Sequence, residues 1–237
     1  MRANGARRDD ADNVYAAACF ASAPIRMERV WAMPNRNTFD IPPIKNLLAE
    51  EMDFSKYWLD PFANRNRLAT VTNDLNPEYD TDYHMDALDF LKMFPDNFVD
   101  GVLYDPPYSP RQVSECYRGV GYNVTNNMTR ASFWSGQKRE ISRIVKIGGK
   151  VITFGWNSGG VGRKYGFEIR RILLIPHGGW HNDTICVVEV KTEKISLQKN
   201  KNQAAICSTQ THEKGMTKYH KQEERRENRE ISRLKDS

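Results

Sequence analysis

The sequence predicts an α/β fold built on a doubly wound, mostly parallel sheet whose last strand runs antiparallel. Short apolar or β-branched runs alternate with segments of helical spacing, and several of these runs end in an acidic residue. Two further strand-like runs, residues 168–175 and 184–190, are joined by a glycine-containing turn, which is typical of a hairpin. A chain of 237 residues is long enough to bury the core of one such domain.

Composition narrows the class of protein. No apolar run approaches the roughly 18–20 residues that a transmembrane helix needs. Residues 13–24 faintly resemble a signal peptide, but acidic residues stand where its positive region belongs. We therefore expect a cytoplasmic protein with no membrane partner. The cysteines form no CxxC pair and no metal-ligand spacing, which favours reduced thiols and no metal site. They are Cys19, Cys116, Cys186 and Cys207.

Charge and composition also divide the chain. Residues 191–237 carry 12 basic and 7 acidic side chains, an excess that equals the net charge of +5 of the whole chain. This segment has few large apolar residues, so it cannot form a core of its own. We expect a flexible extension over residues 1–32, one domain over residues 33–191, and a basic tail over residues 192–237 that is either disordered or helical.

A helix should lie near the start of the domain. Either Asp40 or Pro43 can open it, because acidic caps and a proline in the first turn are both common at helix starts. Ile44, Leu47 and Leu48 then recur at the spacing i, i+3, i+4, which predicts one buried face.

Two strands should follow, over residues 56–62 and 68–72. The first ends in Asp60-Pro61-Phe62, and the second leads into Asp74. A parallel crossover normally needs about 10–12 residues, so the short separation predicts that the connecting helix is missing or very short. The connection Ala63-Asn64-Arg65-Asn66 contains no glycine, but Asn tolerates the left-handed backbone region better than other non-glycine residues do.

The central strand of this fold should be the buried run over residues 99–104. It stops at Asp105-Pro106-Pro107-Tyr108, because proline has no amide hydrogen to continue a ladder. Ligands of open α/β sheets bind at the carboxyl ends of the strands. A carboxylate and a carbonyl of the rigid Pro-Pro turn can accept hydrogen bonds from the amino group of a flat ring there, and a tyrosine can stack on that ring.

The segments before and after this strand predict a capped helix, a long loop, a second helix and a further strand. Asp86 can cap a helix that begins within residues 83–91. A long polar loop should run from residue 109 to residue 133, and loops of this length are commonly lids or binding segments. A helix over residues 132–145, ended by Gly148-Gly149, and a strand over residues 150–156 should come next.

The tetrapeptide Asp105-Pro106-Pro107-Tyr108 resembles the catalytic motif of the N6-adenine DNA methyltransferases that use S-adenosylmethionine, in particular their small members carried by phages and mobile elements. Asp60-Pro61-Phe62, the strand before Asp74 and the step Asp86-Ala87 occur in the family's order, and the resemblance covers about residues 34–191. It implies a class-I methyltransferase fold, which is Rossmann-like. One departure is the cofactor loop, where the family usually has glycines and this chain has asparagines.

The resemblance implies a role for each matching residue. It implies that S-adenosylmethionine is the cofactor and that DNA, with its target adenine flipped or unpaired, is the partner. The catalytic residues would be Asp105, Pro106, Pro107 and Tyr108. The cofactor-binding residues would be Asp60, Pro61, Phe62, Asp74, Asp86 and Ala87. Residues of the long loop and of the final hairpin are candidates for touching the substrate: Arg111, His177, Trp180, His181 and Asn182.

Other interpretations stay open at this stage. N4-cytosine methyltransferases use a closely related tetrapeptide, usually with Ser in place of the Asp. A catalytically degenerate nucleic-acid-binding protein or partner subunit would explain the missing glycines. The sequence does not decide between a homodimer and a subunit of another enzyme. For the loop residues, a glycine turn with satisfied polar side chains is the plainer explanation.

Overall fold

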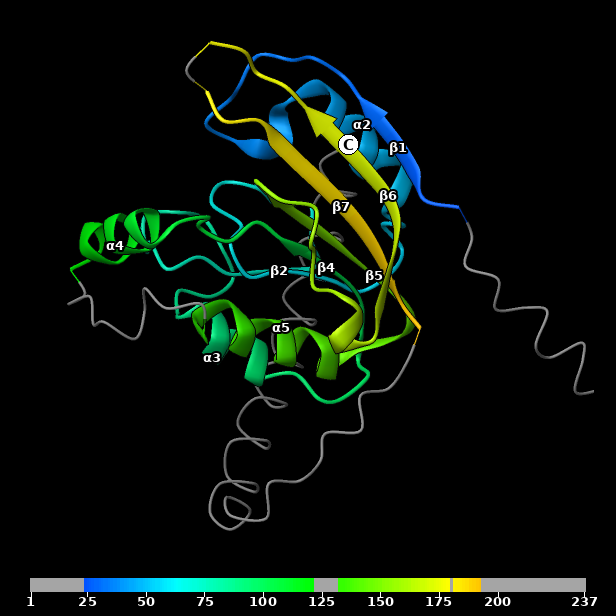
Figure 1. Ribbon diagram of the computed structural model, residues 1–237. Helices are drawn as coiled ribbons and strands as arrows, with labels where there is room; N and C mark the ends of the chain where they lie inside the picture. The colour runs from blue at the N-terminus through cyan, green and yellow to red at the C-terminus, as the bar shows by residue number, and fades with distance from the viewer. Residues whose placement is uncertain (1–23, 122–131, 180, 193–237) are drawn as a thin grey trace, which may run out of the picture.

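The computed structural model describes residues 24–121, 132–179 and 181–192. Within these residues one sheet contains seven strands in the order β1-β6-β7-β5-β4-β2-β3 (Figure 1). The strands are β1 (Arg26–Arg29), β2 (Trp58–Asp60), β3 (Val71–Thr72), β4 (Val99–Tyr104), β5 (Val145–Gly155), β6 (Phe167–Ile175) and β7 (Thr184–Lys191). β7 is antiparallel to both of its neighbours, and the other pairs are parallel. The predicted fold class is confirmed.

Helices cover both faces of the sheet. They are α2 (Pro42–Glu51), α3 (Ala87–Lys92), α4 (Pro110–Gly119) and α5 (Ser132–Ile144), with short 3-10 turns at Thr38–Asp40 and Arg163–Tyr165. Helix α2 packs on one face, whereas α3 and α5 lie side by side on the other, and α4 projects from the end of the sheet (Figure 1). This arrangement is the doubly wound one, and it places α4 beside the carboxyl ends of the strands.

The core consists of two apolar layers, one on each face. Because side chains alternate along a strand, Leu103 of β4 faces the α2 layer, while Val102 and Tyr104 face the layer under α3 and α5. The predicted face of α2 is confirmed: Ile44 and Leu47 are fully buried. Burying each such side chain stabilises the fold by roughly 1.5–3 kcal/mol.

The structure corrects the N-terminal boundary. Residues 1–32 were expected to form an extension, but Arg26–Arg29 is a strand that pairs with β6 at the edge of the sheet. Its four residues carry no alternating apolar pattern, because the strand is exposed on most of its surface. What holds it is a long-range ion pair, in which Arg171 donates to Glu28 at 2.6 Å.

Two further expectations were wrong. The segment after residue 109 was expected to be a loop, but α4 begins there, because Ser109 accepts a hydrogen bond from the backbone N–H of Gln112 and proline occupies the first turn. Helix α5 ends at Ile144, before Gly148-Gly149, and β5 already begins at Val145.

Some predictions fall on residues outside the described ranges. These are most of the N-terminal extension, the segment 122–131, Trp180 and the basic tail from residue 193 onward. In the parts of the chain that are described, no helix has the length and apolar character needed to cross a bilayer.

Candidate active site

The tetrapeptide Asp105-Pro106-Pro107-Tyr108 lies where the sequence predicted, at the carboxyl end of β4. Asp105 is the first residue beyond the strand, and its Oδ1 accepts a hydrogen bond from the Tyr108 hydroxyl. Burial raises the pKa of Asp105, although hydrogen bonds from Tyr108 and Thr38 oppose the rise. No ion pair to this carboxylate is found within the described residues. Within the described residues, Asp105 is therefore a carboxylate without a cation, just beyond the carboxyl end of β4.

The two prolines offer their backbone carbonyls differently. The indole N–H of Trp134, on α5, donates to the Pro107 carbonyl at 3.1 Å. No described residue donates to the Pro106 carbonyl. The carbonyl that remains as an acceptor is thus that of Pro106, which directly follows Asp105 in the chain. Trp134 fixes the turn from its other side and was not singled out from the sequence.

Asp60, at the end of β2, is the most deeply buried acid of the site, with 1% of its surface exposed. Its Oδ1 accepts the Phe62 N–H at 3.0 Å, while its Oδ2 is buried without a hydrogen-bond partner in the described structure. Burial raises the pKa of Asp60 well above its usual range, and the nearby charges of Asp105 and Asp74 raise it further. An orphaned buried oxygen of this kind points to a polar ligand that completes it.

The glycine-poor loop adopts the conformation that asparagine was expected to allow. Asn64 has φ of 51°, in the left-handed region, and no helix separates β2 from β3. The Asn64 N–H donates to Asp74 at 2.9 Å, and the Asn76 N–H donates to the other oxygen of Asp74 at 2.8 Å. Burial raises the pKa of Asp74, and these two hydrogen bonds oppose the rise. The loop keeps its shape without glycine because Asp74 ties it down.

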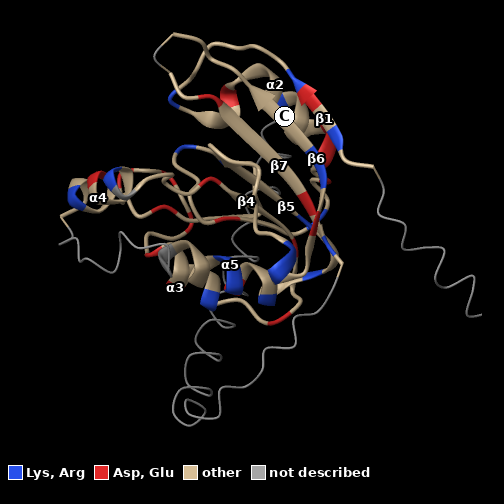
Figure 2. Ribbon diagram, in the orientation of Figure 1, with Lys and Arg blue, Asp and Glu red and all other residues tan. Residues whose placement is uncertain are grey.

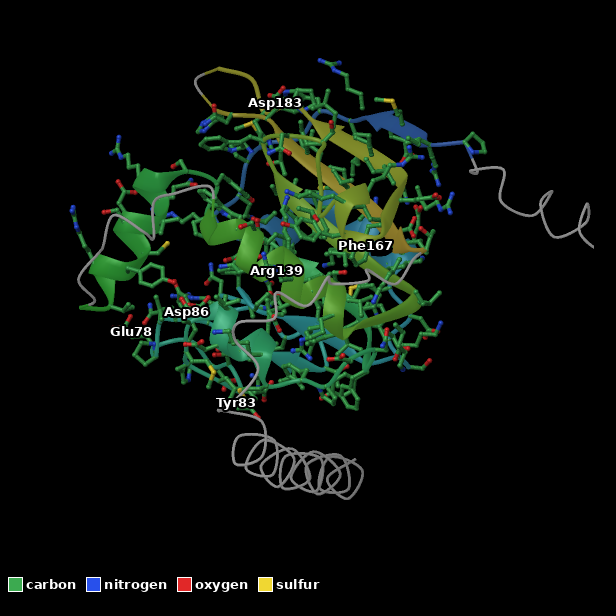
Figure 3. The ribbon with its side chains drawn as sticks, turned by 60° about the horizontal axis from the view of Figure 1, so that its bottom comes forward. Glu78, Tyr83, Asp86, Arg139, Phe167 and Asp183 are labelled. Atoms are coloured by element: carbon green, nitrogen blue, oxygen red, sulfur yellow. The ribbon has the colours of Figure 1, made fainter. Side chains whose placement is uncertain are left out.

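Asp86 caps α3, as predicted, by accepting the Leu88 N–H at 2.8 Å. Its second oxygen accepts a hydrogen bond from the hydroxyl of Tyr117, on α4. Figure 3 shows Asp86 on the side of the molecule where α4 lies, away from Asp183. The sequence interpretation placed Tyr117 in a polar loop and not in a helix beside Asp86, although the Ser109-Pro110 start of α4 could have signalled a helix there.

The residues that were predicted to bind the substrate do not come together at one place, unlike the acidic residues. Arg111 is on the exposed surface of α4 and pairs with Glu115 at 2.7 Å. His177 is buried, with its ring nitrogens 2.8 Å from the Ala32 carbonyl and 2.8 Å from the Thr184 hydroxyl, so it anchors the chain after β6 and does not face a ligand. His181 and Asn182 are exposed. For His177, the structural explanation that the sequence left open is the better one.

The strand order of the sheet identifies the fold. The strand order, with an antiparallel strand inserted between β5 and β6, is that of the class-I methyltransferases. Because β2, β3 and β4 are neighbours in the sheet, their carboxyl ends place Asp60, Asp74 and Asp105 at one edge. Figure 2 shows acidic residues in the loops beside β4 and α4 at this edge.

Comparison with known proteins adds little beyond the fold. No protein family and no curated protein matches the sequence. Among solved structures, TrmN from Thermus thermophilus is 17% identical over 64% of this chain and 49% of its own, with a TM-score of 0.43, so this chain spans about half of its length. The 1,6-didemethyltoxoflavin-N1-methyltransferase of Burkholderia thailandensis is 13% identical over 64% and 77%, with a TM-score of 0.42. The [4+2]-cyclase SpnF is 14% identical over 76% and 90%, with a TM-score of 0.41.

Proposed function

We propose that this protein transfers a methyl group from S-adenosylmethionine to the exocyclic N6 amine of adenine in DNA. The observation that carries the proposal is Asp105, a carboxylate without a cation, next to a carbonyl of Pro106 to which no described residue donates. An amine with two hydrogens needs two such acceptors. Tyr108 belongs to the same turn and supplies an aromatic ring for the base.

One structural observation supports the residues that were predicted to bind the cofactor. Asp60 Oδ2 is buried and unpartnered, at the edge where Asp74 and Asp86 also lie, and such an oxygen suits an ammonium or hydroxyl donor. When bound, S-adenosylmethionine supplies a methyl group on a positively charged sulfur. Asp74 accepts the Asn64 N–H and holds the loop before β3 in a defined shape, although the loop has no glycine.

The chain's own residues then account for the reaction. Hydrogen bonds from the N6 amine to Asp105 and to the Pro106 carbonyl make the nitrogen more tetrahedral and direct its lone pair at the methyl group. A nitrogen–carbon bond forms as the carbon–sulfur bond breaks, and the sulfur leaves as a neutral thioether. The methylated nitrogen carries one proton too many, and Asp105, whose pKa burial raises, receives it before solvent does. Positioning supplies most of the rate enhancement.

Product analysis tests the proposal. The purified protein is incubated with unmethylated DNA and S-adenosylmethionine, and the digested nucleosides are separated by mass. N6-methyldeoxyadenosine is the expected product. N4-methyldeoxycytidine would keep the mechanism but refute the substrate. No methylated base, together with no heat of cofactor binding in calorimetry, would favour a nucleic-acid-binding protein.

Asp105→Ala is the matching variant. It should lose methyl transfer to background and keep its cofactor affinity, because the carboxylate acts on the amine and not on the donor. Asp100→Asn serves as its control, since Asp100 lies on the same strand and pairs with Lys146 at 2.8 Å. Activity that survives Asp105→Ala would remove the central argument.

A further inference from the structure

An exposed tryptophan lies against the catalytic tyrosine. Trp156 directly follows β5, at the carboxyl edge of the sheet, and 43% of its surface is exposed. Its ring centroid is 5.5 Å from that of Tyr108, and the two planes are inclined by 49°. The Tyr108 ring also packs along Gly155, the residue before Trp156, where a Cβ would lie 3.6 Å from it. The two rings thus form one continuous aromatic surface beside Asp105.

Among the described tryptophans, Trp58 and Trp134 are held by their indole N–H groups, whereas Trp156 and Trp31, just after β1, are exposed. Trp58 is only 3% exposed and donates its indole N–H to the Asp53 carbonyl, and Trp134 donates its indole N–H to the Pro107 carbonyl. Trp156 leaves a large apolar face in water next to the acid that the proposed reaction uses. Its contact with Tyr108 at the carboxyl edge of the sheet, where open α/β folds bind ligands, places this exposed ring where it can contact a ligand.

The loop after Trp156 is held by hydrogen bonds at residues 160–162, but residues 157–159 are exposed. Glu189, fully buried in β7, accepts the N–H groups of Val161 at 2.6 Å and Gly162 at 2.9 Å. Lys138 of α5 donates to the Gly160 carbonyl. Residues 157–159 between this anchor and Trp156 are exposed. The ring of Trp156 can therefore shift away from Tyr108 without disturbing the anchored part of the loop.

We infer that Trp156 is the second stacking surface for the target base, which lies between it and Tyr108 during methyl transfer. The inference rests on the proposed function and deepens it. Without a base the two rings contact each other, and the space between them is closed. When the base enters, their single contact is replaced by two ring–base contacts. Stacking requires no particular donor pattern, so Trp156 would hold the flipped base while Asp105 and Pro106 select its amine.

Two substitutions separate stacking from packing. Trp156→Leu keeps an apolar side chain without a π-face, and Trp156→Phe keeps a smaller π-face. With an unmethylated oligonucleotide, we expect Trp156→Leu to raise the KM for DNA by about 10- to 100-fold, the range for losing one base–aromatic stack. Trp156→Phe should recover most of the loss, and the KM for S-adenosylmethionine should stay unchanged in both. Phe54→Ala is the control, because Phe54 is 60% exposed but precedes β2, at the opposite edge of the sheet.

A fluorescent base gives a readout that a merely structural role would not move. The methylated position is mapped with the wild-type protein, and 2-aminopurine then replaces that adenine. Because stacking quenches 2-aminopurine, the complex with Trp156→Leu should be brighter than the wild-type complex. Equal brightness and equal KM for DNA would overturn the inference while leaving the proposed function intact. A wild-type protein that methylates no adenine would instead overturn the proposed function first.

Discussion

Two groups of buried or half-buried carboxylates in this molecule have opposite surroundings. At the outer edge of the sheet, Glu28, Glu50 and Glu51 converge on Arg171, whose side chain is 6% exposed, at 2.6, 2.7 and 3.2 Å. At the carboxyl ends of the strands, Asp60 and Asp105 have no ion pair within the described residues. Figure 2 shows acidic and basic residues interspersed along β1 and its neighbours, unlike the acidic loops beside α4.

The pKa values follow this difference. Burial acts to raise the pKa of Glu51, but hydrogen bonds and charge from Lys150 and Arg171 outweigh it, and the pKa is lowered. For Asp60 and Asp105 burial prevails, and the pKa is raised. A buried carboxylate destabilises the fold unless hydrogen bonds or a ligand compensate it; Asp105 has the hydrogen bond from Tyr108, whereas one oxygen of Asp60 is left for a ligand. A positively charged sulfonium group and an amine are two such ligands.

The largest expected effect on stability concerns the paired group. Arg171→Met removes the cation shared by three carboxylates and should lower the free energy of unfolding by about 3 kcal/mol, at the low end for breaking a buried pair because the glutamates are partly exposed. Urea denaturation at neutral pH measures it. Arg111→Met is the control, since that ion pair is on the surface and should contribute under about 1 kcal/mol.

The same variant has a pH signature. The lowered pKa of Glu51 means that its contribution to stability is present above the ordinary value of 4.5 and is lost as the pH falls through the folded-state pKa. The difference between wild type and Arg171→Met should therefore shrink in acid. A difference that is constant from neutral pH into acid would show that Arg171 acts by packing alone.

A smaller effect is expected for the carboxylates at the carboxyl ends of the strands, which have no ion pair within the described residues. Asp74→Ala should weaken S-adenosylmethionine binding by roughly 1–3 kcal/mol, the range for removing a buried charged hydrogen-bond partner. Part of the loss comes from the loop, because Asn64 and Asn76 both donate to Asp74. Calorimetry measures the affinity, with Asp80→Ala as the control, since its carboxylate is 95% exposed. Unchanged affinity would exclude Asp74 from the cofactor site.

The smallest expected effect is a shift of the pH–rate profile. Burial raises the pKa of Asp105, so methyl transfer should fall on the acid side at a higher pH than an ordinary aspartate would give. The Tyr108 hydroxyl opposes that rise through its hydrogen bond, so Tyr108→Phe should move the acid limb to still higher pH while keeping the stacking ring. A limb that stays in place would contradict the assignment of Asp105 to it.

The features predicted from sequence are those that local chemistry determines. The Asp86 cap and the buried face of α2 each depend on a few adjacent residues. The features that were missed depend on distant partners. Strand β1 requires Arg171, and the burial of His177 requires the Ala32 carbonyl, neither of which a local pattern contains. The contact between Trp156 and Tyr108 likewise joins the ends of two neighbouring strands.

The pairing of β1 with β6 has a consequence for how the chain folds in the cell. Arg26 aligns with Arg171, so the earliest strand of the described chain has its partner only after almost all of the domain has been synthesised. Until then Met27 and Trp31, which stay largely exposed even in the folded protein, have no sheet beside them. Such a long-range pairing adds late and slowly to a folding domain. The nascent chain thus carries this strand and its exposed Met27 and Trp31 without a partner through most of its synthesis, when chaperones and aggregation compete for unpaired strands.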